Sequence, residues 1–188
     1  MRIREAEIDD APVMGNVTVE TFFFAHRDQI PSEVLEARRK NWTVATSAAA
    51  WERTLRGIAD CPNSRECVCV AENGRGEIIG VAMGASAESG IECGVGSVLA
   101  LSVHPKHQRL GAGRLLVMAL AAYLAQHGMT TLHIETLAAN APAHRFYEAL
   151  GGRVFAEREF EDEGHMLPSV VFCWDDITAL LSPSGPIS

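Results

Sequence analysis

Residues 97–120 read SVLALSVHPKHQRLGAGRLLVMAL, and this stretch decides the fold. The apolar start predicts a strand over Ser97–Val103, and helical spacing of apolar residues predicts a helix from about Gly111 to His127. Gly111 and Gly113 stand at the helix start, where backbone N–H groups have no intrahelical acceptor. These groups and the positive end of the helix dipole favour a phosphate or pyrophosphate. The stretch therefore predicts an anion-binding loop; the alternative is a tight turn eased by glycine, with no ligand.

The distribution of charge supports the anion site. No Asp or Glu occurs between Glu92 and Glu135, whereas Lys106, Arg109 and Arg114 all fall inside that interval. Two other nucleotide motifs fail on the same sequence, because GxxxxGK[ST] is absent and the glycines at 94 and 96 precede a strand rather than a helix.

Working outward, strands and helices alternate on both sides of the loop. Strands are expected at about residues 2–7, 66–73, 77–87, 97–103, 130–137, 153–160 and 166–174. Helices are expected at about residues 11–25, 32–40, 47–58, 111–127 and 141–150, with Ser32 and Ser47 as caps of the second and third. Asn73-Gly74 is expected to supply the positive φ angles of a hairpin. This order predicts an α/β protein with a mixed sheet of six to seven strands flanked by helices.

Composition limits the classes of protein. The chain has 188 residues, 47% hydrophobic and 21% charged, with a net charge of −8. We expect one domain over residues 1–176 and a tail over 177–188 that is partly disordered. The acidic balance argues against nucleic acid or an anionic membrane as partner. Without a signal peptide or an apolar run long enough for a bilayer, a cytoplasmic location is expected. Five cysteines without CxxC spacing predict buried free thiols and no metal site.

Two segments carry a resemblance to a known family. Gln108–Gly113 after an apolar strand resembles the Q/R-x-x-G-x-G/A motif of the GNAT superfamily of N-acetyltransferases. Asn140–Gly152 is similar to that superfamily's N-x-x-A-x-x-F/Y-Y-E-x-x-G segment. Residues 25–31 and 167–176 also resemble bacterial GNAT proteins of unassigned substrate. The resemblance implies acetyl-CoA as co-substrate and a sheet whose fourth and fifth strands splay apart around it.

The resemblance also implies which residues hold acetyl-CoA. Backbone groups of Leu101 and Val103 would pair with the pantetheine arm, although both residues also suit a core. Asn140 would bind the same arm, and it also suits a helix cap. The implied cofactor-binding residues are Leu101, Val103, Gln108, Arg109, Leu110, Gly111, Ala112, Gly113, Arg114, Asn140 and Ala143.

Tyr147 is the expected general acid, since a phenol near the sulfur can protonate the departing CoA thiolate. The alternative role for Tyr147 is core packing beside Phe146. For the base, Ser97 stands where the family often has a carboxylate, so Glu92, just upstream, is the first candidate. Glu135 and His104 are further candidates, and a chain of water molecules is an alternative to all of them.

The acceptor pocket is expected between the first helices, the stretch 88–96 and the loop before the last strand. At least one of the phenylalanines 22–24 should line a pocket or an interface, and packing between helices is expected for the other two. The acidic run 161–163 is either a solvated turn or an attractant for a cationic amine. The expected reaction is direct transfer of acetyl to a primary amine of a small molecule in a ternary complex. The alternatives are a non-catalytic acyl-CoA sensor, or acetylation of a peptide N-terminus or lysine. Paired subunits are common in the family, so a homodimer is expected.

Overall fold

The structure is a computed structural model and describes residues 1–61, 63–86 and 94–181. Seven strands form one sheet in the order β1-β2-β3-β4-β5-β7-β6. Neighbouring strands are antiparallel except β4 and β5, which run parallel. The strands are β1 (Arg2–Glu5), β2 (Glu66–Glu72), β3 (Ile78–Ser86), β4 (Val95–Val103), β5 (Thr131–Leu137), β6 (Arg153–Asp162) and β7 (His165–Trp174). The expected α/β class with a mixed sheet is confirmed.

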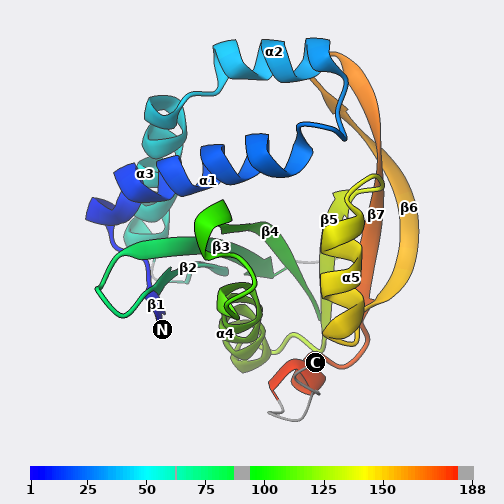
Figure 1. Ribbon diagram of the computed structural model, residues 1–188. Helices are drawn as coiled ribbons and strands as arrows, with labels where there is room; N and C mark the ends of the chain where they lie inside the picture. Colours follow the sequence, from blue (N-terminus) through cyan, green and yellow to red (C-terminus); the bar gives the residue numbers. More distant parts are fainter. Residues whose placement is uncertain (62, 87–93, 182–188) are drawn as a thin grey trace.

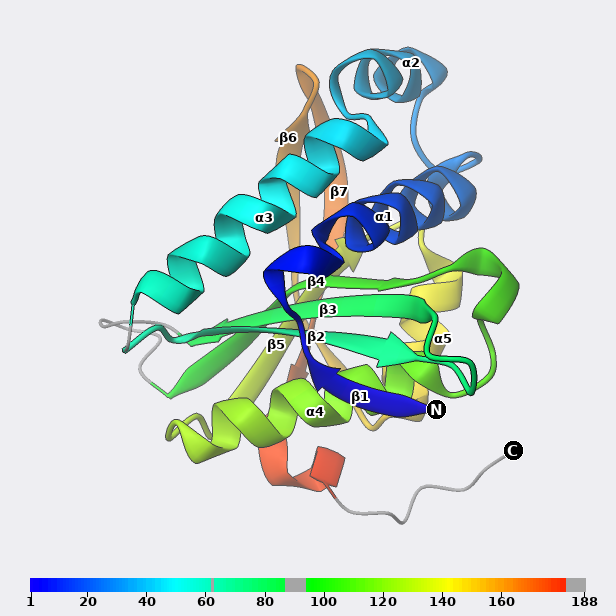
Figure 2. The ribbon, with the colours of Figure 1, turned by 90° about the vertical axis from the view of Figure 1, so that its left-hand side faces the viewer.

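Helices cover both faces of this sheet (Figures 1 and 2). On one face, α1 (Ala11–His26) and α3 (Val44–Asp60) pack on a core that includes Met14, Trp51 and Val70. On the other face, α4 (Ala112–Gln126) and α5 (Ala141–Ala149) share the larger core with β5 and β7. No helix in the described part of the chain is long and apolar enough to cross a membrane.

Helix α2 (Ser32–Asn41) stands away from the centre of the sheet and beside the tip of the β6–β7 hairpin (Figures 1 and 2). Its apolar side chains form a third, smaller core with β5 and β7. The buried members of this core are Ile30, Val34, Leu35, Leu137 and Leu167. Helix α2 is therefore attached to the end of the sheet rather than to one of its faces.

The third helix begins at Val44, three residues before Ser47, because two threonines cap it. Thr43 accepts the Thr46 N–H through its hydroxyl at 3.2 Å, and the Thr46 hydroxyl accepts the Thr43 N–H at 2.8 Å. This reciprocal pair satisfies two N–H groups of the first turn. The prediction that Ser47 caps this helix is wrong. Ser47 is a residue of the first turns of α3, and it is buried.

The β2–β3 turn also differs from expectation. The positive φ angle is at Gly76, at 76°, and not at Asn73 or Gly74. Asn73 instead accepts the N–H groups of Arg75 and Glu77 through its side-chain oxygen, at 2.9 and 3.1 Å. An Asn side chain that mimics a backbone turn in this way needs no positive φ of its own.

The end of the chain and the cysteines require two further corrections. Residues Ile177–Leu181 form a short 3-10 helix, and its Ile177 and Leu180 are buried in the α4 core. Packing therefore extends past residue 176, where the tail was expected to begin. Buried thiols are found at Cys69 and Cys173, whereas Cys61 is exposed.

Candidate active site

The sheet forks between its two parallel strands. Strands β4 and β5 pair from Val95↔Thr131 to Val98↔Ile134 and no further. Beyond this point β4 stays paired with β3 as far as Val103, and β5 stays paired with β7 as far as Leu137. The described ends of both strands thus present inner edges that are not paired with each other. The expected splaying of the fourth and fifth strands is confirmed.

A bulge in β4 lies at the origin of the fork. The register with β3 passes from Met83↔Ala100 to Gly84↔Val98, so Leu99 is the extra residue. A bulge bends its strand and increases the local twist, which turns β4 away from β5. Leu99 is 56% exposed, unusual for leucine in a central strand. Sequence reasoning did not find this bulge, because an apolar run carries no signal for it.

Leu101 and Val103 lie on the open edge of β4. Their side chains pack against the α4 core, as their alternative role required. A strand residue packs its side chain above the sheet while its backbone groups lie in the plane of the sheet. Core packing therefore leaves the edge of β4 open to an added strand.

The loop after β4 is held by its own backbone and by Gln108. The Gln108 side-chain amide donates to the carbonyl of Val103 at 3.0 Å. Arg109 and Gly111 have φ angles of 64° and 88°, in the left-handed region. Gly111 is the N-cap of α4 and has no side chain that could accept a hydrogen bond. The N–H groups of the first helical turn therefore have no capping side chain as a partner.

The two glycines of the motif have different surroundings. A Cβ atom on Gly111 would meet no atom within 4 Å, so space there is open. A Cβ on Gly113 would lie 3.3 Å from the Phe146 ring of α5. Gly113 therefore lets α4 and α5 approach closely, a role in packing that the motif alone did not reveal. Leu110 is 65% exposed and Ala112 is buried.

Asn140 lies three residues after the end of β5 and directly before α5. Its side-chain oxygen accepts the Ala143 N–H at 3.3 Å, which caps α5, and its amide donates to the Thr136 hydroxyl at 3.3 Å. The capping role is confirmed. Ala143, half-buried, is held by this bond at the first turn of α5.

Tyr147 is buried, with 6% of its surface exposed, among the rings of Phe146, Phe172 and Trp174. Burial raises the pKa of its phenol above the usual value. Its hydroxyl makes no hydrogen bond with any residue that the structure describes. Tyr147 is thus a neutral phenol in an apolar setting and also a core residue, as its alternative role required.

Glu135 is the carboxylate nearest to the fork in the register. It follows Ile134, the last residue of β5 that pairs with β4. Ile134 packs toward α4, so Glu135 lies on the opposite face, where Leu137 contacts α1 and α2. Its carboxylate accepts a hydrogen bond from the buried hydroxyl of Ser169 on β7. Sequence reasoning missed Ser169, although a serine inside an apolar strand was a signal.

The other two candidates for the general base are His104 and Glu92. His104 is occupied: its Nδ1 accepts the Lys106 N–H at 3.3 Å, and its Nε2 lies 2.8 Å from the carboxylate of Glu20 on α1. His104 is therefore engaged in linking α1 to the end of β4. Glu92 lies outside the described residues, as does most of the stretch 88–96.

The acidic run before the last strand is already partnered. Asp162, only 6% exposed, forms an ion pair with Arg38 of α2, and Glu163 accepts the Asn41 amide at 3.0 Å. The Arg38 guanidinium also stacks over the rings of Phe22 and Trp42, at 5.0 and 5.4 Å. The run was expected to be a solvated turn or to attract a cationic amine. Asp162 does neither, because it is buried and Arg38 neutralises its charge.

The three phenylalanines of α1 have two kinds of surroundings. Phe22 and Phe23 pack against Trp42 and the small core of α2. Phe24 is 46% exposed beneath the guanidinium of Arg27. Two phenylalanines therefore pack between helices and one faces solvent.

These features fit an acyl-CoA molecule. The fork offers two strand edges for an amide-bearing arm, and the glycine-capped start of α4 offers N–H groups and open space for a pyrophosphate. The forked mixed sheet with this loop defines the fold of CoA-dependent N-acetyltransferases.

Comparison with known proteins also indicates an N-acetyltransferase fold. The model of the Acetyltransferase (GNAT) family matches residues 31–152, and the chain belongs to this family. It is 28% identical over 179 residues to the uncharacterized N-acetyltransferase YuaI of Bacillus subtilis, with 95% of each chain covered.

Two solved structures with bound cofactor share the fold. The PaiA N-acetyltransferase of Thermoplasma acidophilum, in complex with coenzyme A, has a TM-score of 0.68 at 15% identity, covering 89% of this chain and 96% of that one. The yncA protein of Salmonella typhimurium, with its cofactor acetyl-CoA, has a TM-score of 0.66 at 19% identity, covering 100% and 97%. At these identities the likeness establishes the fold alone.

Proposed function

We propose that this protein transfers the acetyl group of acetyl-CoA directly to a primary amine of a small molecule, in a ternary complex. The observation that carries the proposal is the fork between β4 and β5, which opens toward the glycine-capped start of α4. An acyl chain entering there passes Glu135 on one face of the sheet and the Tyr147 core on the other.

In this proposal the cofactor is held mainly by backbone. Leu101 and Val103 pair with the amide-bearing arm along the open edge of β4, and Asn140 bonds the same arm from the end of β5. Residues Gln108–Arg114 surround the pyrophosphate, and the left-handed conformations of Arg109 and Gly111 turn their N–H groups toward it. Lys106, Arg109 and Arg114 add positive charge in a segment free of carboxylates.

When bound, acetyl-CoA supplies the acyl group as a thioester. Holding an amine beside this group provides most of the rate, since proximity and orientation are worth roughly 7–11 kcal/mol. The amine nitrogen bonds to the acyl carbon as the carbon–sulfur bond breaks. Tyr147 holds a proton on its phenol oxygen and donates it to the leaving sulfur, a role suited to a phenol that burial keeps neutral. The attacking nitrogen loses its second proton as the amide forms, and this proton returns to the Tyr147 oxygen through solvent and restores the phenol.

We assign the base to Glu135, in place of Glu92. Its carboxylate lies at the fork, on the face that α1 and α2 cover, and its contact with Ser169 orients it. A protonated amine that enters from this face gives its proton to the Glu135 carboxylate, directly or through water, before it attacks.

The experiment is mass spectrometry of the protein mixed with acetyl-CoA and a pool of small amines and short peptides. Acetylated small amine together with free CoA, above a control without enzyme, supports the proposal, and the product mass names the acceptor class. Acetylation of the peptides alone favours the protein-directed alternative. Acetyl-CoA binding without product from any pool favours the sensor, and absence of binding contradicts the assignment of the fork.

A further inference from the structure

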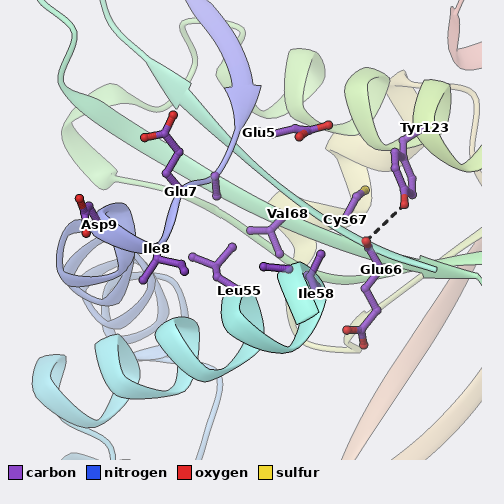
Figure 3. A pocket seen from close by; sticks show the side chains of 12 residues that line it. Glu5, Glu7, Ile8, Asp9, Leu55, Ile58, Glu66, Cys67, Val68 and Tyr123 are labelled. Carbon is purple, nitrogen blue, oxygen red and sulfur yellow. Dashed lines mark hydrogen bonds between the residues drawn. The ribbon is translucent and has the colours of Figure 1, made fainter. Parts of the chain in front are cut away.

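A groove lies at the β1 edge of the sheet (Figure 3). It is bounded by residues 5–9, 55–59 and 66–68 and by Tyr123 of α4. Its volume is about 610 Å³, within the range of small-molecule sites. Two strand spacings, about 10 Å, separate β2 from β4, and β3 lies between them. An occupant of the groove therefore cannot reach the acyl group, and the fork's function does not explain the groove.

The middle of the groove is apolar. Ile8, Leu55, Ile58 and Val68 lie together in the centre of the view (Figure 3). Leu55 and Val68 are 6% and 5% exposed, so they form a firm floor that belongs to the α1–α3 core. A surface of this kind favours an alkyl or aryl body.

Four carboxylates surround this apolar floor: Glu5, Glu7, Asp9 and Glu66 (Figure 3). Among the twelve residues that line the groove, none is lysine or arginine. The four carboxylates take part in no ion pair within the described part of the chain. Arg4, which is close in sequence, is already paired with Asp10 and Glu72. The charge of Arg56 on α3 acts on Asp9, whereas the other three carboxylates have no cationic partner among the residues that line the groove.

The negative charge of Glu5 contributes to raised pKa values of two groups in the groove, the Cys67 thiol and the Tyr123 phenol. Burial raises the pKa of the Cys67 thiol to about 12, and the negative charge of Glu5 adds to the effect. Burial also raises the pKa of Tyr123, again with a contribution from Glu5. The Glu5 carboxylate thus acts across the groove interior, where a cation would be stabilised and a second anion is not.

We propose that this groove is a second ligand site, which binds an amphipathic cation: an ammonium group carried on an alkyl or aryl body. The apolar floor receives the body and the surrounding carboxylates receive the ammonium group. The site is separate from the acetyl-transfer fork, so the proposal does not depend on the function assigned to that fork.

The test uses three probes with the same six-carbon chain: hexylammonium, hexanol and hexanoate. Binding to the whole protein without acetyl-CoA is measured by calorimetry, and hydrogen exchange locates the site. We expect hexylammonium to bind about tenfold more tightly than hexanol, since ammonium–carboxylate attraction near a surface is worth on the order of 1 kcal/mol or more. Hexanoate should not bind, and exchange should slow in residues 55–59 and 66–68.

A matched pair of variants separates this groove from the fork. Glu5→Gln combined with Glu66→Gln removes two charges at constant shape and should weaken hexylammonium binding about tenfold. The control, Glu157→Gln combined with Glu159→Gln, removes two charges from exposed positions of β6 and should leave binding unchanged. Thermal unfolding of all variants verifies that each is folded.

Three results would overturn the proposal. Equal affinity for hexanol and hexylammonium would reduce the groove to an apolar surface. Slower exchange at β4 and β5 in place of residues 55–59 and 66–68 would place amine binding at the fork alone. Protection of the groove that rises with protein concentration, without any amine, would assign it to a second copy of the chain.

Discussion

The two sides of the fork are built in different ways. On the proposed cofactor side, the loop from Gln108 to Arg114 and the start of α5 are short continuous segments, whose key contacts join residues three to five positions apart. On the acceptor side, the contacts join residues far apart in the chain: Arg38 to Asp162, and Ser169 to Glu135. One side uses backbone conformation and the other uses side-chain pairing. Mutations should therefore affect the two sides through different observables.

The largest effect is expected at the pair that holds α2 to the β6–β7 hairpin. Asp162→Ala leaves the Arg38 guanidinium without its buried partner, which should cost about 3 kcal/mol of unfolding free energy. Denaturant unfolding measures the loss. Acetyl-CoA affinity, measured by calorimetry, should stay unchanged, because the cofactor side does not use this pair. Loss of both together would contradict the division between the two sides.

The next effect concerns the base. Glu135→Gln keeps the shape and removes proton acceptance, so turnover should fall about 100-fold while acetyl-CoA affinity is kept. Steady-state kinetics with the acceptor found by mass spectrometry tests this. Ser169→Ala should give a smaller loss, because it removes only the hydrogen bond that orients Glu135. Full activity of Glu135→Gln would return the role to water or to Glu92.

On the cofactor side, Gly111→Val should weaken acetyl-CoA binding about 30-fold, since a β-branched residue resists the left-handed conformation by roughly 2 kcal/mol. Gly128→Val is the matched control, because Gly128 has a similar φ of 83° and open space around its Cβ, at the other end of α4. The control should lose stability and keep its affinity for acetyl-CoA. Equal affinities in both variants would remove the loop from the cofactor site.

The smallest effect is expected at Tyr147. Tyr147→Phe should lower turnover about tenfold with cofactor affinity nearly kept, because a thiolate is a good leaving group and needs little help. The ring packing with Phe172 and Trp174 is preserved, so stability should change little. Rates equal to those of the parent protein would make Tyr147 a core residue only.

Prediction from the sequence succeeded where the signal is local. The order of strands and helices, the glycine-containing loop and the cap at Asn140 follow from periodicity and from residue types at neighbouring positions. Prediction failed where two residues could cap the same helix and where segments far apart in the sequence pack together. Two threonines displaced Ser47 as the cap of α3, and Ile177 and Leu180 joined the core from a segment expected to be a partly disordered tail. The separate role of Gly113 depends on the position of Phe146 in another helix.

By itself, the sequence determined the class of fold and the position of the glycine-containing loop at the start of α4, because helix starts, glycine conformations and hydrophobic periods depend on residues within a few positions. Only the tertiary structure decided which carboxylates remain available. It paired Asp162 with Arg38 and Glu20 with His104, placed Glu135 at the fork, and gathered Glu5, Glu7, Asp9 and Glu66 around an apolar groove. Charge interactions act through space with no period along the chain, so their partners are set by how the elements pack.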